Sequence, residues 1–349
     1  MRLGILTGGG DCPGLNAVIR AAVLTAELRH NDEVLGYLDG WKGVLDGAYR
    51  PLDVPGCRDI LPEGGTILGT SRTNPFSVDG GPERVVANLQ AERVDALVAV
   101  GGEDTLGVAH RLADHGVHCV GVPKTIDNDL SGTEVTFGFD TAVQTATEAI
   151  DRLRTTAESH HRVIVCEVMG RHVGWIATHA GIAGGAAEIL VPEVPFELDD
   201  VCERLRRRHA GGQFSSIVVI SEGALPAEGP TADAARDATT SASKDQFGHA
   251  RLGGIGAWLA EEIEARTGYE ARVTILGHIQ RGGTPSAFDR VLATRFGVEA
   301  VAAVHDGAFG MMVALQAGQI VRVPLAEAVA KAKSVDLGLY RDVAGVFRG

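Results

Sequence analysis

The fold of this chain is decided by two neighbouring stretches, residues 95–105 (DALVAVGGEDT) and residues 117–129 (VHCVGVPKTIDND). Each begins with an apolar run of the length and continuity that indicate a buried strand. The residues between the two runs, 104–115, have a helical pattern, so the stretch as a whole predicts a βαβ unit. Ligands of such units bind outside the carboxyl ends of the strands, and both polar loops lie there.

The polar loops contain the residue types that phosphate chemistry uses. Glycines let a backbone approach a phosphate closely, and Glu103, Asp127 and Asp129 can hold a hard divalent cation or accept a proton. The alternative is a pair of ordinary strand-to-helix turns rich in glycine and aspartate. We favour the functional interpretation, because three carboxylates and Lys124 at one sheet edge are costly unless they have partners.

Composition narrows the class of protein. The chain has 349 residues, 45% of them hydrophobic, with 46 glycines and only 5% aromatic residues, which is typical of an α/β protein of two domains. Its net charge of −13 argues against a nucleic-acid partner. The five cysteines form no C-x-x-C pair, and no stretch is long and apolar enough for a signal peptide or a membrane span. We therefore expect a soluble cytoplasmic protein with reduced cysteines and no membrane partner.

The alternation of strand and helix continues along the chain. Further strands are predicted at 3–7, 163–168, 217–221 and 272–276, and further helices at 17–28 and 252–266. This pattern predicts an α/β fold of two Rossmann-like, three-layer αβα domains with largely parallel sheets. We expect one domain over 1–140, completed by later segments, a second over 141–310, and a C-terminal segment, 311–349, that packs back on them. Residues 225–244 are expected to form an exposed insertion.

Glycine-rich and basic loops follow most of the other predicted strands. Gly8–Asp11 leads from the first strand into a helix, a junction that favours anions, although it is neither a Walker A loop nor a G-x-G-x-x-G motif. Arg72 ends the loop 64–72, and one arginine there can bind two phosphate oxygens. The second half of the chain contributes Arg162, Met169–Arg171, Glu222, Arg272 and His278–Gly283. Taken singly, Arg72 could equally be a solvated surface residue and His278 a core histidine.

Taken together and in order, these loops resemble the 6-phosphofructokinase family from end to end. The family's sequence of motifs is a glycine loop, Gly-Thr-Ser-Arg, Gly-Gly-acid, Thr-Ile-Asp-Asn-Asp, Met-Gly-Arg, Ser-Glu-Gly and His-Ile-Gln-Arg-Gly-Gly, found here over residues 8–283. The resemblance implies the phosphofructokinase fold and, with Mg²⁺, phosphoryl transfer to the 1-hydroxyl of fructose 6-phosphate in glycolysis. Such a reaction depends on positioning and charge neutralisation more than on covalent help from the protein.

The resemblance also implies residue roles and a division into a donor domain followed by a sugar-phosphate domain. Asp127 corresponds to the general base and Arg171 to a residue that stabilises developing charge. The donor side would comprise Gly10, Arg72, Gly102 and Thr105, with Glu103 at the metal. The sugar-phosphate side would comprise Thr125, Asp127, Met169, Gly170, Arg171, Glu222, His278 and Arg281. Arg162 and Arg272 match residues that a neighbouring subunit supplies, so a homo-oligomer with shared sites, a dimer or a tetramer, is expected.

Two positions indicate which phosphoryl donor is used. Asp104 and Lys124 stand where the ATP-using members have glycine, and together they resemble the pyrophosphate-dependent subgroup. A carboxylate at 104 would repel the α-phosphate of a nucleotide, and an ammonium at 124 would stabilise pyrophosphate and its leaving phosphate. The sequence thus implies pyrophosphate and fructose 6-phosphate as substrates, in a reversible reaction. Glu103, where many members have aspartate, is longer by one methylene.

Three alternatives remain open at this stage. The nearest alternative is the same fold with ATP as the donor. Asp104 and Lys124 discriminate between pyrophosphate and ATP as donors. NAD and lipid kinases also use glycine-rich acidic loops, but they do not account for Met-Gly-Arg or His-Ile-Gln-Arg. A non-catalytic sugar-phosphate sensor is disfavoured by Asp127 and by the complete donor side.

Overall fold

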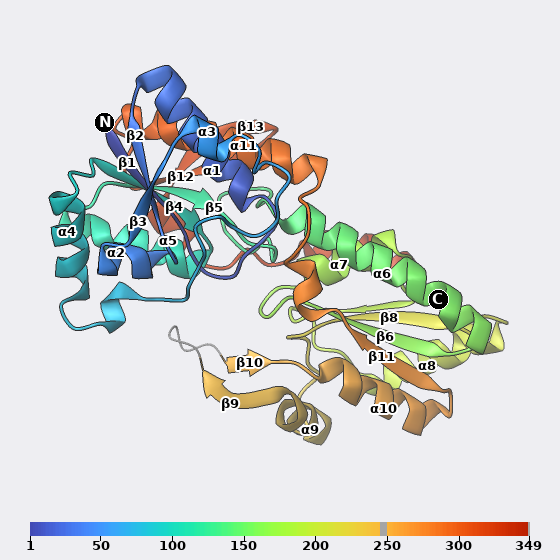
Figure 1. Ribbon diagram of the computed structural model, residues 1–349. Coiled ribbons are helices and arrows are strands. Elements are labelled where there is room, and N and C mark those ends of the chain that lie inside the picture. The colour runs from blue at the N-terminus through green and yellow to red at the C-terminus, as the bar shows by residue number, and fades with distance from the viewer. Residues whose placement is uncertain (245–249, 348–349) are drawn as a thin grey trace. The chain divides into compact units, whose positions relative to one another are not determined.

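The computed structural model describes residues 1–244 and 250–347. These residues form two compact units (Figure 1). Unit 1 contains residues 1–141 and 281–332, and unit 2 contains 142–244, 250–280 and 333–347. The described chain therefore passes from one unit to the other at 141/142, 280/281 and 332/333.

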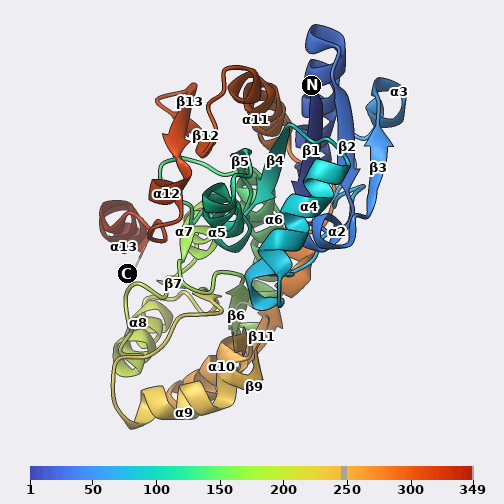
Figure 2. The same ribbon diagram turned by 90° about the vertical axis from the view of Figure 1, so that its left-hand side faces the viewer.

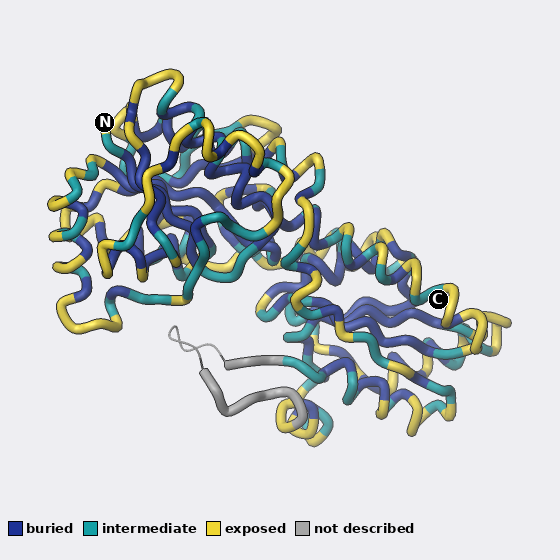
Figure 3. The backbone as a smooth tube through the Cα atoms, viewed as in Figure 1, coloured by how far each residue is buried: buried dark blue, intermediate teal, exposed yellow. Residues whose placement is uncertain are grey.

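Unit 1 is built on a seven-stranded sheet in the order β13-β12-β5-β4-β1-β2-β3. Its strands are β1 (Arg2–Thr7), β2 (Glu33–Tyr37), β3 (Tyr49–Leu52), β4 (Ala96–Gly101), β5 (Cys119–Pro123), β12 (Met311–Gln316) and β13 (Gln319–Pro324). The five central strands pair in parallel, and only the edge strands β3 and β13 run antiparallel to their neighbours. Strands β1, β4 and β5 are buried along almost their whole length (Figure 3), which explains their unbroken apolar sequence.

Helices cover both faces of this sheet (Figure 1). One face packs against α2 (Trp41–Asp46), α4 (Gly81–Ala91), α5 (Glu103–Leu112) and α12 (Leu325–Ala328). The other carries α1 (Leu15–Thr25) and α11 (Ala287–His305), which pack along each other. Short elements complete the unit: η1 (Ala26–His30), α3 (Val54–Cys57), η2 (Pro75–Ser77) and η3 (Ala113–His115).

Unit 2 is built on a four-stranded parallel sheet in the order β11-β6-β8-β7. Its strands are β6 (Val163–Val168), β7 (Glu188–Leu190), β8 (Ser216–Ser221) and β11 (Ala271–Ile275). One face packs against α8 (Leu198–Ala210), α9 (Pro230–Thr239) and α10 (Ile255–Thr267) (Figure 2). The other carries α6 (Phe139–His160) and α7 (Trp175–Ala183) (Figure 1). The remaining elements are β9 (Thr240–Lys244), β10 (Ala250–Leu252), η4 (Gly277–Gln280), η5 (Leu339–Ala344) and α13 (Gly345–Phe347).

The units divide the chain differently from the sequence-based boundaries. Residues 281–310, expected in the second domain, belong to unit 1 because α11 packs along α1. Residues 311–349, expected as one C-terminal segment, are shared between the units as far as they are described: β12 and β13 extend the sheet of unit 1, whereas residues 333–347 belong to unit 2.

The predicted elements are present, with small shifts at their ends. The helix predicted at 17–28 begins earlier, because Gly14, with φ 107°, turns the chain into α1, and it ends as the π-helical turn η1. The helix predicted from 252 begins only at Ile255, after two glycines. The insertion at 225–244 is not simply an exposed loop: it contains α9, whose Ala232 and Ala235 are fully buried. None of the helices in the described part of the chain is long and apolar enough to cross a membrane.

The packing of α1 on α11 yields a stability prediction. A Cβ atom on Gly297 would lie 2.6 Å from the carbonyl oxygen of Val18, so Gly297→Ala forces the two helices apart and should cost about 1–3 kcal/mol of unfolding free energy. Gly107→Ala in α5 is the matched control, because no atom lies within 4 Å of its added Cβ, and it should stabilise by roughly 0.5–1 kcal/mol. Urea unfolding measures both variants, and equal losses would contradict the packing.

Candidate active site

Three loops of unit 1 are held together at the carboxyl ends of β1, β4 and β5. The Gly8 N–H donates to the carbonyl of Val100 at 2.9 Å, and the Lys124 N–H donates to the carbonyl of Gly101 at 3.0 Å. Because the three strands are parallel neighbours, the glycine loop, the acidic loop and the 124–129 loop meet at one sheet edge, as the sequence predicts.

Thr105 fills the junction between these loops. A Cβ atom on Gly8 would lie 2.5 Å from the Thr105 hydroxyl oxygen, and one on Gly101 would lie 2.3 Å from the Thr105 Cβ. Thr105 is 3% exposed, and its carbonyl accepts from the indole N–H of Trp41 at 3.2 Å. Thr105, predicted on the donor side, thus packs between the glycine loop and the acidic loop. Its side chain leaves no space for a Cβ atom at Gly8 or Gly101.

The acidic residues lie at the N-terminus of α5. Gly102 precedes the helix in an extended conformation, and Glu103 and Asp104 occupy its first turn. Glu103 is exposed, whereas Asp104 is partly buried. The positive end of the helix dipole favours negative charge at this position, whether from these side chains or from a phosphate.

Lys124 lies beside the glycine loop. Its side chain is buried, with 3% exposed, and its Nζ donates to the carbonyl of Gly10 at 2.5 Å. Burial lowers the pKa of Lys124, the positive charge of Arg281 lowers it further, and the carboxylates of Asp129 and Asp127 oppose the shift. Burial disfavours the charged form of Lys124, so a phosphate bound beside the ammonium group would stabilise that form.

Arg281, which the resemblance places among the sugar-phosphate residues, belongs to unit 1. Its guanidinium donates to the carbonyl of Asp11 at 3.3 Å, and a Cβ atom on Gly10 would lie 2.6 Å from its Nη1. Two cations, Lys124 and Arg281, therefore lie along the Gly9–Asp11 backbone.

The segment that carries Arg72 is bound to the same loop. The Thr70 hydroxyl donates to the carbonyl of Gly9 at 2.6 Å, and the Gly9 N–H donates to the carbonyl of Ser71 at 3.1 Å. The buried amide of Asn16 holds the beginning of the segment, since it donates to the carbonyl of Glu63 at 3.1 Å and accepts from the Ile67 N–H at 2.8 Å. Sequence reasoning missed Asn16, whose only signal is a polar residue inside an otherwise apolar first helical turn.

The 125–129 loop is ordered by its own side chains. The Thr125 hydroxyl accepts from the Asp127 N–H at 3.0 Å, and the Thr125 carbonyl accepts from the Thr136 hydroxyl at 2.7 Å. Asn128 adopts a left-handed conformation, φ 53°, while its side-chain oxygen accepts from the Thr136 N–H at 3.1 Å. The loop therefore presents the partly buried Asp127 in one defined position.

The chemistry of these carboxylates fits a magnesium ion that is shared with a phosphate ligand. Among the described residues, no three His, Cys, Asp or Glu side chains gather closely enough to hold a metal ion by themselves. Mg²⁺ commonly binds through one or two carboxylates together with substrate phosphates and water. Glu103, exposed at the helix N-terminus beside the glycine loop, can supply one such carboxylate.

In unit 2, most of the predicted sugar-phosphate residues gather at the carboxyl ends of β6, β8 and β11. The Gly170 carbonyl accepts from the Ser221 hydroxyl at 2.7 Å and from the Gly223 N–H at 3.1 Å. The Met169 N–H donates to the side chain of Gln280 at 3.4 Å, which ties η4 to the same loop. This edge of the sheet contains Met169, Gly170, Arg171, Glu222 and His278.

Gly170 and Gly223 allow these loops to approach one another. Gly170 has φ 136°, and a Cβ atom there would lie 2.4 Å from the Ser221 hydroxyl oxygen. A Cβ atom on Gly223 would lie 1.9 Å from the carbonyl oxygen of Arg171. The position of the Arg171 loop therefore depends on a glycine in the Ser-Glu-Gly motif.

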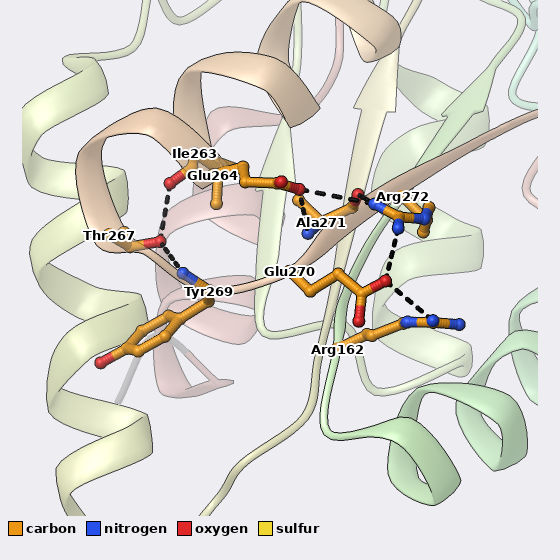
Figure 4. A network of polar contacts seen from close by, with 8 residues as sticks. All are labelled: Arg162, Ile263, Glu264, Thr267, Tyr269, Glu270, Ala271 and Arg272. Atoms are coloured by element: carbon orange, nitrogen blue, oxygen red, sulfur yellow. Dashed lines mark hydrogen bonds and ion pairs between the residues drawn. The ribbon is translucent and has the colours of Figure 1, made fainter.

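The structure does not bring Arg162 and Arg272 to that edge. Arg162 immediately precedes β6 and Arg272 is the second residue of β11, so both lie at the amino end of the sheet. There they flank one carboxylate, that of Glu270, to which Arg162 is paired at 2.8 Å (Figure 4). Arg272 also lies 3.5 Å from the carboxylate of Glu264 (Figure 4). The side chains of Arg162 and Arg272 are 28% and 54% exposed, respectively.

Comparison with known proteins identifies the family. The phosphofructokinase family model matches residues 2–304, and the chain therefore belongs to the phosphofructokinase family. A solved structure of Pichia pastoris phosphofructokinase in the T-state superposes with a TM-score of 0.82 and 33% identity, covering 94% of this chain and 35% of that one. The expected fold class, two αβα units of the phosphofructokinase type, is confirmed.

Two full-length relatives carry different donor names. A Streptomyces coelicolor protein named pyrophosphate--fructose 6-phosphate 1-phosphotransferase is 60% identical over 350 residues, which is 100% of both chains. A second protein of that organism, named ATP-dependent 6-phosphofructokinase 3, is 53% identical over 342 residues, 98% of both chains. Both names agree with the acceptor that the motifs imply, and they differ in the donor.

Proposed function

We propose that this chain transfers a phosphoryl group from pyrophosphate to the 1-hydroxyl of fructose 6-phosphate, reversibly, giving fructose 1,6-bisphosphate and phosphate. The observation that carries the proposal is the buried ammonium of Lys124 on the carbonyl of Gly10, combined with a carboxylate, Asp104, in the first turn of α5. The name of the 60% identical relative supports the same donor.

The residues of unit 1 handle the donor in this proposal. Gly10, Gly102, Arg72 and Thr105 form or hold the donor loops, Lys124 neutralises the leaving phosphate, and Glu103 holds Mg²⁺. When bound, Mg²⁺ would neutralise phosphate charge. Asp104 excludes a nucleotide, because its carboxylate would repel the charge of an α-phosphate.

The chemical step needs a base and a cation at the transferring group. Asp127 takes the proton of the 1-hydroxyl as that oxygen bonds to phosphorus, and the electron pair of the breaking P–O bond leaves with the second phosphate. Thr125 contacts the transferring group, and Arg171 stabilises the charge that develops on it. Met169, Gly170, Glu222, His278 and Arg281 bind the sugar phosphate.

Arg162 and Arg272 supply the sugar 6-phosphate site of a neighbouring subunit, so we propose a homo-oligomer with shared sites. This assignment is supported by their place at the amino end of the sheet, remote from the sugar-side loops of their own unit.

A cytoplasmic location belongs to the same proposal and is supported by the five buried, free cysteines. An ATP-dependent phosphofructokinase is the second candidate, favoured by the name of the 53% identical relative.

A donor assay tests the proposal directly. With fructose 6-phosphate and Mg²⁺, the wild-type chain should turn over pyrophosphate with a higher kcat/KM than ATP. Lys124→Gly should lower pyrophosphate turnover by roughly 10² or more, the size expected for deleting a group that stabilises transition-state charge. Asp104→Gly should permit some use of ATP, because the repulsion of the α-phosphate is relieved. A wild-type preference for ATP, or two variants with unchanged donor ratios, would overturn pyrophosphate as the donor.

The role of Asp127 is tested by Asp127→Asn, which keeps the shape of the side chain and removes the base. We expect kcat to fall by roughly 10² to 10⁴, the usual range for a positioned general base, with fructose 6-phosphate binding largely kept. Kinetics should be paired with a thermal melt. Near-normal turnover, or a loss explained by unfolding alone, would remove Asp127 from this role.

Subunit mixing tests the shared sites. Arg162→Ala and Asp127→Ser homo-oligomers should each be inactive, because each lacks one component of every site. Mixed oligomers should recover part of the activity, since some sites would combine an intact Asp127 with an intact Arg162 from the neighbour. Verified mixed oligomers without recovered activity would count against sharing.

A further inference from the structure

The loop that carries Arg171 is a tight turn between β6 and α7. Gly170, with φ 136°, turns the chain back on itself, and a Cβ atom there would lie 2.5 Å from the carbonyl oxygen of Val173. Val173 is 3% exposed, whereas Arg171 is only partly buried. Arg171 therefore lies at the tip of a turn whose two legs, Gly170 on one side and Val173 and Gly174 on the other, lie against each other.

The two legs of this turn are held by different partners. The first leg is bound to β8, since the Gly170 carbonyl accepts from the Ser221 hydroxyl at 2.7 Å. The second leg is bound to a carboxylate that the proposed reaction does not use, that of Glu193. The Gly174 N–H donates to both oxygens of this carboxylate, at 3.1 and 3.0 Å. The position of Arg171 between the legs thus depends on Glu193 as well as on the Ser-Glu-Gly motif.

Glu193 is placed for this contact by the chain that follows β7. Val191 is 0% exposed and packs so closely on Gly174 that a Cβ atom added to the glycine would lie 2.4 Å from the Val191 Cβ. Gly174 immediately precedes α7, and the positive end of the helix dipole favours a carboxylate at that point. Close packing and electrostatics therefore both favour the contact between Glu193 and Gly174.

The same carboxylate binds the C-terminal segment of unit 2. Oxygen Oε1 of Glu193 also accepts from the Val335 N–H at 2.9 Å. A second hydrogen bond docks this segment on β7, since the hydroxyl of Tyr340, which is 2% exposed, donates to the carbonyl of Ile189 at 2.7 Å. The contacts of Glu193 therefore allow two roles, docking of the segment and positioning of Arg171, and an experiment has to separate them.

We propose that Glu193 is a positioning residue that fixes the second leg of the turn and thereby places the guanidinium of Arg171 against the transferring phosphoryl group. The carboxylate of Glu193 binds backbone N–H groups and acts on the reaction through Arg171. The inference rests on the proposed function in one respect, the role given there to Arg171. The sugar-binding residues Met169 and Gly170 have partners of their own, so loss of the Glu193 carboxylate should affect turnover more than sugar-phosphate binding.

The test removes both acceptor oxygens of Glu193 and uses the phosphoryl donor that the wild-type chain prefers. Glu193→Met keeps an unbranched side chain of similar length but replaces the carboxylate by a thioether, a weak acceptor. We expect kcat to fall roughly tenfold, which corresponds to about 1.4 kcal/mol of transition-state stabilisation, while KM for fructose 6-phosphate stays within about twofold. Glu193→Gln should retain most of the wild-type kcat, because one oxygen, at the position of Oε1, can still accept from both Gly174 and Val335.

A matched control separates this role from docking of the C-terminal segment. Tyr340→Phe removes one hydrogen bond of the same segment, to the carbonyl of Ile189, and leaves the contact between Glu193 and Gly174 in place. It should lower the melting temperature and leave kcat unchanged. If Tyr340→Phe loses as much kcat as Glu193→Met does, docking alone explains both losses and the proposal is overturned.

A double-mutant cycle with Arg171→Ala shows whether Glu193 acts through Arg171. If it does, Glu193→Met should lower kcat roughly tenfold in the wild-type background and hardly at all in the Arg171→Ala background. If Glu193→Met does not fold, Glu193→Asp, in which the carboxylate is withdrawn by one methylene, takes its place in the cycle and should also lower kcat.

The outcomes of the cycle distinguish the inference from the proposed function. Additive losses of kcat, or a normal kcat in the Glu193 variant beside a slow Arg171→Ala, would overturn the positioning role alone. A normal kcat in Arg171→Ala would contradict the role that the proposed function gives to Arg171, and the inference would fall with it.

Discussion

The donor loops depend on close backbone packing at the ends of three parallel strands. Thr105 occupies the volume that side chains on Gly8 and Gly101 would need, and the hydrogen bonds between the loops follow from that approach. The fit leaves no space for a methyl group at either glycine, so the loops pack directly against one side chain. Groups as far apart in sequence as Gly10 and Lys124 can then share a hydrogen bond.

In the proposed function, the charges at this edge of the sheet determine which donor binds. Lys124 and Arg281 are close enough for their charges to interact unfavourably, and a bound polyphosphate would convert that repulsion into attraction to a common partner. Asp104, in the first turn of α5, acts in the opposite sense on a donor that extends toward it. A compact polyanion such as pyrophosphate, bound at Lys124 without extending toward Asp104, satisfies both conditions of the proposal.

The sequence was informative where a feature is local and less so where it depends on packing between distant segments. The apolar runs predicted the buried strands, and the motifs at their ends predicted two groups of loops, both of which the structure gathers at sheet edges. The place of Arg281 in unit 1 could not be predicted, because it follows from α11 packing along α1. Asn16 was missed for a similar reason: its partner, the 63–67 segment, is distant in sequence.

The two ends of the unit 2 sheet have different residues: the sugar-side loops lie at the carboxyl end, and Arg162 and Arg272 lie at the amino end. Arg162 and the Met169–Arg171 loop are separated by the six residues of β6, which is roughly 20 Å of extended chain. Arg162 and Arg272 therefore cannot bind a phosphate that is held by the sugar-side loops of their own unit. Both nevertheless share the carboxylate of Glu270, so they are held side by side before any anion arrives. In the proposed homo-oligomer, such preorganisation of two cations would favour the dianionic 6-phosphate bound by a neighbouring subunit.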